Sequence, residues 1–491
     1  MEKKYKKLAT DTILFGISSF GSKILVFLLL PLYTNILSTA DYGTYDLINN
    51  IVLLIYPILT LGIIESIIRI SYDQGVEKNE ILSNCLFILG IGAAILLCVA
   101  PFLGCFSDTL KLYWPYLCLF YISYVLYLCL SYYCKAKNMI KFFAIQGIVN
   151  TALTISLNLL FLLVFKLGLK GYFLATILSY FLTSIFIIIF GKVYKDIFHY
   201  RLNFKLLKNM LKFSLPLIPT LVAWWINTSI DKYFIIYYSG IEASGIYSVA
   251  HKIPSILTVV VTIFNSAWEL STIQSYNDED KSEFYSNIYK YFFICCSFVC
   301  LILIIFSKII GRVLFASDYF VAWKYIAVLL VSSLFSSLSG FTASIFRSYK
   351  KTVNLMVSVI VGAAVNIILN YFFIKQFDVM GAAYATMISF FVVWLIREIC
   401  LHKLIKIKIP IVKWSIAMIL ITVSAILFGN DFKYKYAVCG LVFLIYFIIF
   451  FKDIKRIVIK VVKGLKEKTR PTKETIVNDD TAIDQNIVDK E

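Results

Sequence analysis

Fourteen long apolar stretches, separated by short polar connections, dominate the pattern of this chain of 491 residues. A helix needs about 20 consecutive apolar residues to cross a bilayer. The pattern therefore predicts an all-α integral membrane protein with twelve to fourteen transmembrane helices, because several stretches are short or interrupted by glycine. The predicted spans are 12–35, 44–69, 81–106, 113–134, 142–165, 171–191, 213–239, 246–269, 287–310, 321–346, 354–374, 381–400, 414–429 and 434–451.

Positive charges alternate between the connections. When residues at the very ends of the spans are counted with the adjoining connection, 35 of the 47 Lys and Arg residues belong to every second connection and the termini, 9 belong to the other connections, and 3 lie deeper inside apolar stretches. Cytoplasmic connections of membrane proteins are enriched in Lys and Arg. The alternation thus predicts that both termini are cytoplasmic, and it singles out Lys23, Lys232 and Lys252 as charges within the membrane.

Composition agrees with a membrane protein, since 60% of the residues are hydrophobic, 15% are charged and the mean hydropathy is +0.83. The net charge of +18 is spread over short caps beside the spans, which favours anionic lipid over nucleic acid as the partner. Eleven cysteines without a CxxC pair and three scattered histidines give no support for a metal site.

Two related halves are visible in the chain. Gly43 and Tyr45 match Gly245 and Tyr247 at an offset of 202 residues, and 171–176 matches 381–386 at an offset of 210. Six spans per repeat is an even number, so the copies are related by an axis along the membrane normal. The predicted units are a six-helix lobe 12–191, a cytoplasmic amphipathic linker 192–212, a second six-helix lobe 213–400, an extra pair of helices 414–451 and a disordered tail 452–491.

Enzymatic motifs are limited to near misses. The run from Gly16 to Lys23 has the Lys and Ser of a phosphate-binding loop in the wrong order and lies inside an apolar stretch. Asp278 and Asp280 have the spacing of a metal-dependent glycosyltransferase, but they lie in a short connection without a nucleotide-binding domain. We expect no catalytic residues, no metal and no resident cofactor, and we expect a transporter.

Polar residues inside the spans carry the functional signal. In the seventh span, Trp224, Asn227, Thr228 and Asp231 share one helical face. The eighth span has a polar stripe from Tyr247 through His251 and Ser255 to Glu269, the first has Ser19, Ser22 and Lys23, and the second has Asp46, Asn49, Asn50 and Glu65.

Two interpretations of these polar residues stay open. Hydroxyl and amide side chains often join helices by hydrogen bonds, whereas a charge at mid-membrane is costly and is usually paired or lines a water-filled cavity. Lys23 favours a cavity role. Lys252 lies near enough to the outer edge to reach it, and Asp231 is either functional or the structural partner of a lysine.

Short motifs resemble one family. The runs 15–24 (FGISSFGSKI), 30–37 (LPLYTNIL) and 41–46 (DYGTYD) resemble the opening of polysaccharide biosynthesis flippases, the Wzx-type branch of the MOP exporter superfamily. The runs 213–219 (FSLPLIP), 231–234 (DKYF) and 244–248 (SGIYS) resemble the start of their second lobe. The likeness covers residues 8 to about 450.

This resemblance implies a MATE-like fold. It further implies that the protein exports undecaprenyl-diphosphate-linked oligosaccharide repeat units, such as those of O-antigen or capsule, across the bacterial cytoplasmic (inner) membrane by alternating access. It also implies membrane lipids and the polymerase and glycosyltransferases of the same pathway as partners. A lipid II-type peptidoglycan flippase and a MATE-type multidrug or cation exporter are the alternatives. The intramembrane lysines, in place of a dense arginine set, disfavour the first alternative, and the positive charge disfavours the second.

The candidate site follows from both lines of reasoning. A diphosphate needs positive charge, and a sugar chain needs polar and aromatic partners. Repeated export also needs an energy source, for which an H+ or Na+ gradient is the candidate, while passive transport pulled by consumption of the glycan stays open. The candidate substrate-binding residues are Lys23, Lys252, Lys232, Ser19, Ser22, Asn49, Trp224, Asn227 and His251. The candidates for ion coupling are Asp231, Thr228 and Glu65.

Overall fold

The computed structural model describes residues 29–73, 75–105, 107–276 and 278–468, together with Leu8 and Thr12, and this part of the chain contains helices and no strand. The helices of the first half are α2 (Leu30–Ile36), α3 (Thr39–Leu59), α4 (Ile63–Ile70), α5 (Lys78–Val99), η1 (Ala100–Cys105), α6 (Asp108–Ala136), α7 (Ile140–Leu159), η2 (Leu160–Val164), α8 (Gly168–Phe190), α9 (Tyr194–Phe198) and α10 (Phe204–Ser214). Those of the second half are η3 (Leu215–Leu217), α11 (Ile218–Ala250), α12 (Lys252–Gln274), α13 (Lys281–Leu314), η4 (Ser317–Ala322), α14 (Trp323–Ser348), α15 (Thr352–Phe377), α16 (Val379–Leu404), α17 (Ile411–Gly429) and α18 (Lys435–Lys468).

The predicted spans reappear as helices. Among the described residues, eleven helical segments are long and apolar enough to cross a membrane, or twelve when α3 and α4 count as one bent span. One of these segments runs over 71 residues, from Phe204 to Gln274, and contains both the seventh and the eighth predicted spans. The first predicted span lies outside the described residues except for Thr12 and for its end, where α2 begins at Leu30.

Two glycine positions separate helical segments. Gly240 inside α11 has φ 88° and ψ 170°, which breaks the helix after the predicted end of the seventh span. Leu61 and Gly62 have φ of 50° and 63° and separate α3 from α4, whose axes differ by 59°. Glycine adopts this left-handed region without steric cost, so the break is expected at Gly62. The Ser214 hydroxyl at the end of α10 donates to the Leu61 carbonyl at 2.8 Å and holds this break.

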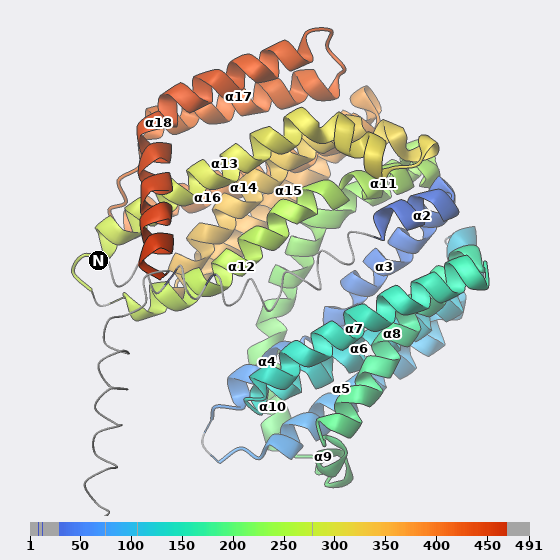
Figure 1. Ribbon diagram of the computed structural model, residues 1–491. Coiled ribbons are helices and arrows are strands. Elements are labelled where there is room, and N and C mark those ends of the chain that lie inside the picture. Colours follow the sequence, from blue (N-terminus) through green and yellow to red (C-terminus); the bar gives the residue numbers. More distant parts are fainter. Residues whose placement is uncertain are drawn as a thin grey trace, which may run out of the picture.

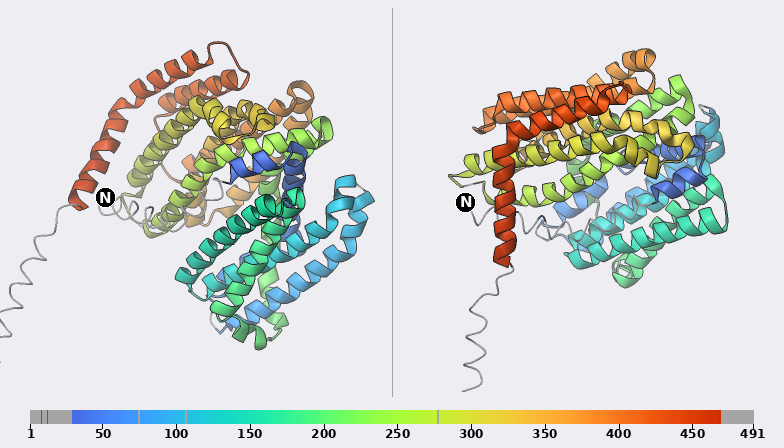
Figure 2. Two further views of the ribbon diagram at one scale, coloured as in Figure 1. Left: turned by 45° about the vertical axis from the view of Figure 1, so that its right-hand side comes forward. Right: turned by 45° about the horizontal axis from the view of Figure 1, so that its top comes forward.

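The helices form two groups, and each has its own apolar core (Figure 1). Helices α3 to α8 make up one group, and helices α12 to α16 make up the other. Helix α11 packs against α3 of the first group and α15 of the second. Helices α17 and α18 lie on the side of the second group that faces away from the first (Figure 2).

The two groups meet at one end through a pair of glycines. A Cβ atom on Gly43 of α3 would lie 2.3 Å from the Ile241 carbonyl oxygen, and one on Gly245 of α11 would lie 2.0 Å from the Thr39 carbonyl oxygen. These are the two glycines that the repeat alignment equates. The Tyr319 hydroxyl adds a bond across the same contact by donating to the Ser38 carbonyl at 2.7 Å. The repeats therefore touch at equivalent positions, as expected for two lobes related by an axis along the membrane normal.

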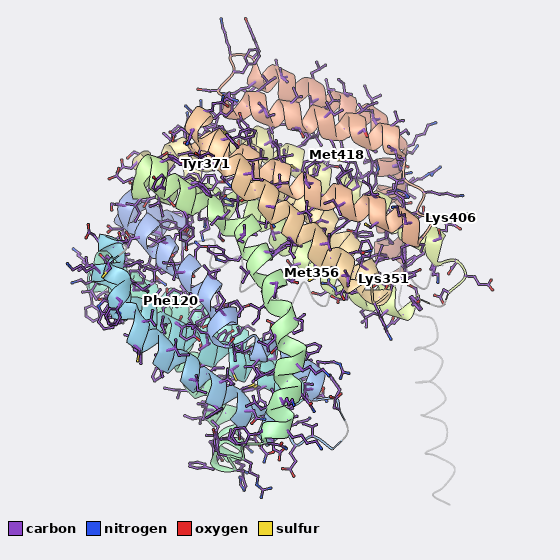
Figure 3. The ribbon with its side chains drawn as sticks, turned by 180° about the vertical axis from the view of Figure 1, so that it is seen from behind. Phe120, Lys351, Met356, Tyr371, Lys406 and Met418 are labelled. Atoms are coloured by element: carbon purple, nitrogen blue, oxygen red, sulfur yellow. The ribbon has the colours of Figure 1, made fainter. Side chains whose placement is uncertain are left out.

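The opposite ends of the two groups diverge (Figure 1). Lys351 and Lys406 both lie towards the diverging ends, and Tyr371 lies towards the end where the groups meet (Figure 3). Lys351 and Lys406 belong to connections that the charge alternation assigns to the cytoplasm. With that orientation, the two groups meet at their outer ends and diverge at their cytoplasmic ends.

Labelling of single introduced cysteines tests this orientation. A membrane-impermeant maleimide added to intact cells is expected to label Ser107→Cys or Asn430→Cys above the parent protein, and to leave Lys141→Cys and Lys208→Cys at the parent level. The parent is the necessary background because it has exposed native thiols, such as Cys105. Labelling at the lysine positions but not at Ser107 or Asn430 would show that the topology is the opposite of the predicted one.

Candidate functional site

Asp46 on α3 lies at the centre of a buried polar network between α3 and α11. Its carboxylate accepts hydrogen bonds from Lys232 Nζ, Ser248 Oγ and Asn50 Nδ2, each at 2.8 Å. The side chains of Asp46 and Lys232 are only 10% and 12% exposed. Asp46 and Ser248 are equivalent in the repeat, since they are 202 residues apart, so the network lies beside the pseudo-symmetry axis.

The Asp46–Lys232 pair has consequences for the predicted role of Lys232. Removing one partner of a buried ion pair usually costs about 3–5 kcal/mol because the other charge is left uncompensated. Lys232 thus neutralises Asp46, and its ammonium is not a free receptor for substrate. Lys232 directly follows Asp231, so the two side chains leave the helix on different sides. In the structure, Lys232 pairs with the carboxylate of Asp46.

Asp231 on α11 forms a second buried network. Its side chain is 1% exposed, and its Oδ2 accepts hydrogen bonds from Tyr247 Oη at 2.7 Å and Thr386 Oγ1 at 3.1 Å. Its Oδ1 accepts from the backbone N–H of Lys232 at 3.0 Å. His251 Nε2 lies 3.8 Å from Oδ2, without another hydrogen-bond partner among the described residues. Asp231 therefore connects both segments of α11 with α16, and a protonated His251 would face it.

Lys252 differs from both aspartates because it is exposed. It begins α12, lies within electrostatic range of Asp46 and Lys232, and has no acidic partner within 4 Å in the described ranges. Further along α12, Ser255, Thr258, Thr262 and Ser266 are exposed on the same helix. We call these five residues the α12 stripe. A row of polar side chains with an ammonium at its head suits contact with water or a polar ligand better than contact with acyl chains.

The other predicted site residues are spread over several environments. Asn227 donates to the carbonyls of Ala223 and Val359 at 2.9 Å, and Thr228 bonds to carbonyls of its own helix, so neither contacts Asp231 by a hydrogen bond. Trp224 is 40% exposed and packs edge-on against Phe390. Asn49 is partly buried on α3. Ser19, Ser22 and Lys23 lie outside the described residues.

Glu65 occupies a separate place at the far end of the first group. It lies on α4, partly buried and within electrostatic range of Lys135 on α6. Its counterpart in the second group is Glu269, which pairs with Arg347 Nε at 2.9 Å. Lys135 and Arg347 directly follow the fourth and tenth predicted spans, which occupy equivalent places in the two repeats. Each lobe therefore has an acid and a base near these helix ends: Glu269 and Arg347 form an ion pair, whereas Glu65 and Lys135 lie within electrostatic range of each other.

Five contributors to these networks were absent from the candidates, namely Asp46, Asn50, Ser248, Tyr247 and Thr386. Asp46 and Ser248 are separated by the repeat offset, which is a signal that could have identified them. Thr386 ends the run 381–386, which was recognised only as a repeat motif. No group of three or more His, Cys, Asp or Glu residues suited to a metal lies in the part of the chain that the structure describes.

A separate cavity lies elsewhere in the described residues. It measures about 390 Å³ and lies between α16 and α17, lined mainly by apolar residues such as Trp394, Trp414 and Met418. Figure 3 labels Met418 on α17, in the extra pair of helices. This cavity is therefore separate from the two aspartate networks.

Comparison with known proteins identifies the family of the chain. Residues 8–269 match the family described as "Polysaccharide biosynthesis protein", and residues 216–372 match the family described as "MatE". An uncharacterized membrane protein, MJ1068, of Methanocaldococcus jannaschii is 20% identical over 515 residues, which cover 94% of this chain and 99% of that protein.

Solved structures share the fold. The lipid II flippase MurJ in an inward closed conformation gives a TM-score of 0.68 at 18% identity and covers 90% of this chain and 99% of its own. An inward-facing multidrug resistance MATE family transporter gives 0.66 at 15% identity, covering 78% and 95%. A MOP superfamily transporter from Pyrococcus furiosus gives 0.58 at 18% identity, covering 82% and 96%. The chain has the two-lobed MATE-like fold and belongs to the polysaccharide biosynthesis protein family of the MOP superfamily.

Proposed function

We propose that this protein is a flippase for undecaprenyl-diphosphate-linked oligosaccharide repeat units. It takes them from the cytoplasmic to the outer leaflet of the bacterial inner membrane during biosynthesis of a surface polysaccharide such as O-antigen or capsule. Both termini are cytoplasmic in this proposal, and the partners are membrane lipids together with the polymerase and glycosyltransferases of the same pathway.

The observation that carries the proposal is Lys252, which is exposed and has no acidic partner within 4 Å among the described residues. It is the cation of the α12 stripe, and it lies beside an aspartate that Lys232 already neutralises. A diphosphate entering between the lobes would find a charge partner there, and a charge-assisted hydrogen bond contributes about 1.5–3 kcal/mol. The serine and threonine hydroxyls further along the stripe suit a sugar chain.

The same geometry argues against a cation exporter. An organic cation needs an accessible carboxylate, but Asp46 pairs with Lys232, and Asp231 is 1% exposed and bonded to two hydroxyls. The exposed charge at this point of the fold is positive. We therefore favour an anionic headgroup as the cargo.

Alternating access requires the two lobes to separate at the Gly43–Gly245 contact and to approach each other at the ends that diverge here. A proton or sodium gradient is the proposed energy source, and Asp231 is the residue proposed to bind the proton or the sodium ion. Periodicity places Asn227 and Thr228 on the same helical face as Asp231. The groups that donate hydrogen bonds to the Asp231 carboxylate are instead the hydroxyls of Tyr247 and Thr386.

Reconstituted vesicles test the substrate. Lys252→Glu is expected to slow translocation of a fluorescent undecaprenyl-diphosphate oligosaccharide by about tenfold or more, since an attraction becomes a repulsion, while Lys252→Arg keeps most of the rate. Translocation is measured as loss of cleavage by an impermeant glycosidase. Lys166→Glu, in an exposed outer connection, is the matched control.

Two outcomes would contradict the proposal. Wild-type protein that leaves the lipid-linked oligosaccharide in place but moves an organic cation such as ethidium would be an exporter. Equal translocation by Lys252→Glu and the wild type would show that Lys252 does not bind the substrate.

A further inference from the structure

Positive charges on the expected outer side are concentrated at one corner of the second lobe. Five of the nine Lys and Arg residues in or directly beside the outer connections come from the end of α13, the start of α14 and the turn into α18. We call Lys308, Arg312, Lys324, Lys433 and Lys435 the outer basic cluster. The ends of α13 and of the α17–α18 pair lie side by side (Figures 1 and 2).

Trp323 and Asp431 hold the centre of this cluster together. The ammonium groups of Lys308 and Lys435 lie 4.6 Å and 4.8 Å from the centroid of the Trp323 ring. Asp431 pairs with Lys435 and lies 3.9 Å from Lys308 Nζ. Lys324 is within electrostatic range of Asp431. The contacts join the second lobe, through Lys308 and Trp323, to the extra pair of helices, through Asp431 and Lys435.

The cluster has more positive charge than its own acids neutralise. Asp431 is shared between Lys308 and Lys435, and Asp318 in η4 is bonded to Ser317. Arg312 and Lys433 are exposed and Lys324 is partly exposed, and none of them has an acidic partner within 4 Å in the part of the chain that the structure describes. Three cations therefore remain available to an anion from outside the chain.

An exposed apolar strip lies next to these cations. Phe306, Ile309 and Val313 of α13 are 46%, 52% and 72% exposed, and they precede or flank Arg312 on the same helix. A helix end with apolar residues below and cations above has the arrangement of a site at the membrane–water interface. A ligand with an acyl chain and an anionic headgroup would use both parts, whereas an acidic peptide or free phosphate would use only the cations.

We propose that the outer basic cluster binds an anionic phospholipid of the outer leaflet, with its phosphate between Arg312, Lys324 and Lys433 and an acyl chain along the α13 strip. The bound lipid spans the junction between the second lobe and the α17–α18 pair and stabilises it. This site is independent of the substrate and of the path between the lobes.

Lipid binding to the purified full-length protein tests the site. Native mass spectrometry with phosphatidylglycerol is expected to give at least about tenfold weaker binding for Arg312→Gln/Lys324→Gln/Lys433→Gln than for the wild type. The control, Lys111→Gln/Lys166→Gln/Lys170→Gln, removes the same charge from outer connections of the first lobe and is expected to bind as the wild type does. Replacing the three residues by Lys, Arg and Arg in the same order is expected to retain binding.

A comparison of three ligands distinguishes binding of a phospholipid from binding of a free phosphate. Phosphatidylglycerol is expected to raise the midpoint of thermal unfolding, while phosphatidylcholine and glycerol phosphate leave it unchanged. An equal effect of glycerol phosphate would make this an anion site without a lipid and would overturn the proposal. Equal losses in the test and control variants, or tight binding of an acidic peptide in place of the lipid, would overturn it as well.

Discussion

Gly245→Ala is expected to hold the outer ends of the two lobes apart and to stop translocation. The added Cβ would lie 2.0 Å from the Thr39 carbonyl oxygen, a backbone atom that cannot move alone, and Gly43→Ala meets the Ile241 carbonyl oxygen at 2.3 Å. Overpacking of this kind costs about 1–3 kcal/mol. That penalty falls on the state in which the outer ends meet, so the equilibrium constant for this state is expected to drop by about 5- to 150-fold.

Distance measurements between the lobes report this shift. Spin labels at Lys111 and Lys375, exposed on the outer ends of the first and second lobes, are expected to move apart in either glycine variant. The labels require bio-orthogonal amino acids because the chain has eleven native cysteines. Gly147→Ala, a helical glycine with no atom within 4 Å of its Cβ, is the matched control. An unchanged distance distribution with normal translocation would show that the close glycine contact is not needed for transport.

Asp231→Asn is expected to remove the response of translocation to an ion gradient. Asparagine keeps the size of the side chain but can neither carry a proton at this position nor neutralise a sodium ion. The wild type is expected to speed up under one imposed gradient, of H+ or of Na+, and the variant to lose about tenfold or more of that response, because the ion's binding free energy no longer differs between states.

Asp453→Asn is a suitable control for this prediction. Asp453 is also a buried aspartate, 6% exposed, but it pairs with Lys290 at 2.7 Å between α18 and α13. The control is expected to keep the gradient response even where its stability falls. If Asp231→Asn responds to both gradients as the wild type does, Asp231 has a structural role and the energy for transport enters elsewhere.

Hydropathy was enough to predict the fold because lipid sets a nearly fixed length for each span. The seventh span was predicted to end at residue 239, and the helix breaks at Gly240. The candidate site was harder to predict. Asp231, Asn227 and Thr228 share a helical face, but periodicity does not say which neighbours the side chains bond.

Periodicity did not predict hydrogen bonds between residues that are distant in the sequence. Lys232 reaches Asp46 over 186 residues, and Thr386 reaches Asp231 over 155. Both contacts depend on how α3 and α16 cross α11, and tertiary packing determines those crossings. The repeat offset is the one sequence signal that anticipates such a contact, since it relates Asp46 to Ser248.

The helical path from Phe204 to Gln274 makes the two lobes mechanically continuous. One end is docked on the first lobe, where Ser214 bonds to Leu61, and the other end is α12 of the second lobe. A stiff rod with both ends held would resist any rocking of one lobe against the other. Gly240 interrupts the rod with φ 88° and ψ 170°, and apart from its chain neighbours and its own helix no atom lies within 4 Å of its Cβ position. Helical hydrogen bonds stiffen the segments on either side, so any rocking of the lobes is expected to change the two backbone dihedrals of Gly240 more than those of the helical residues beside it.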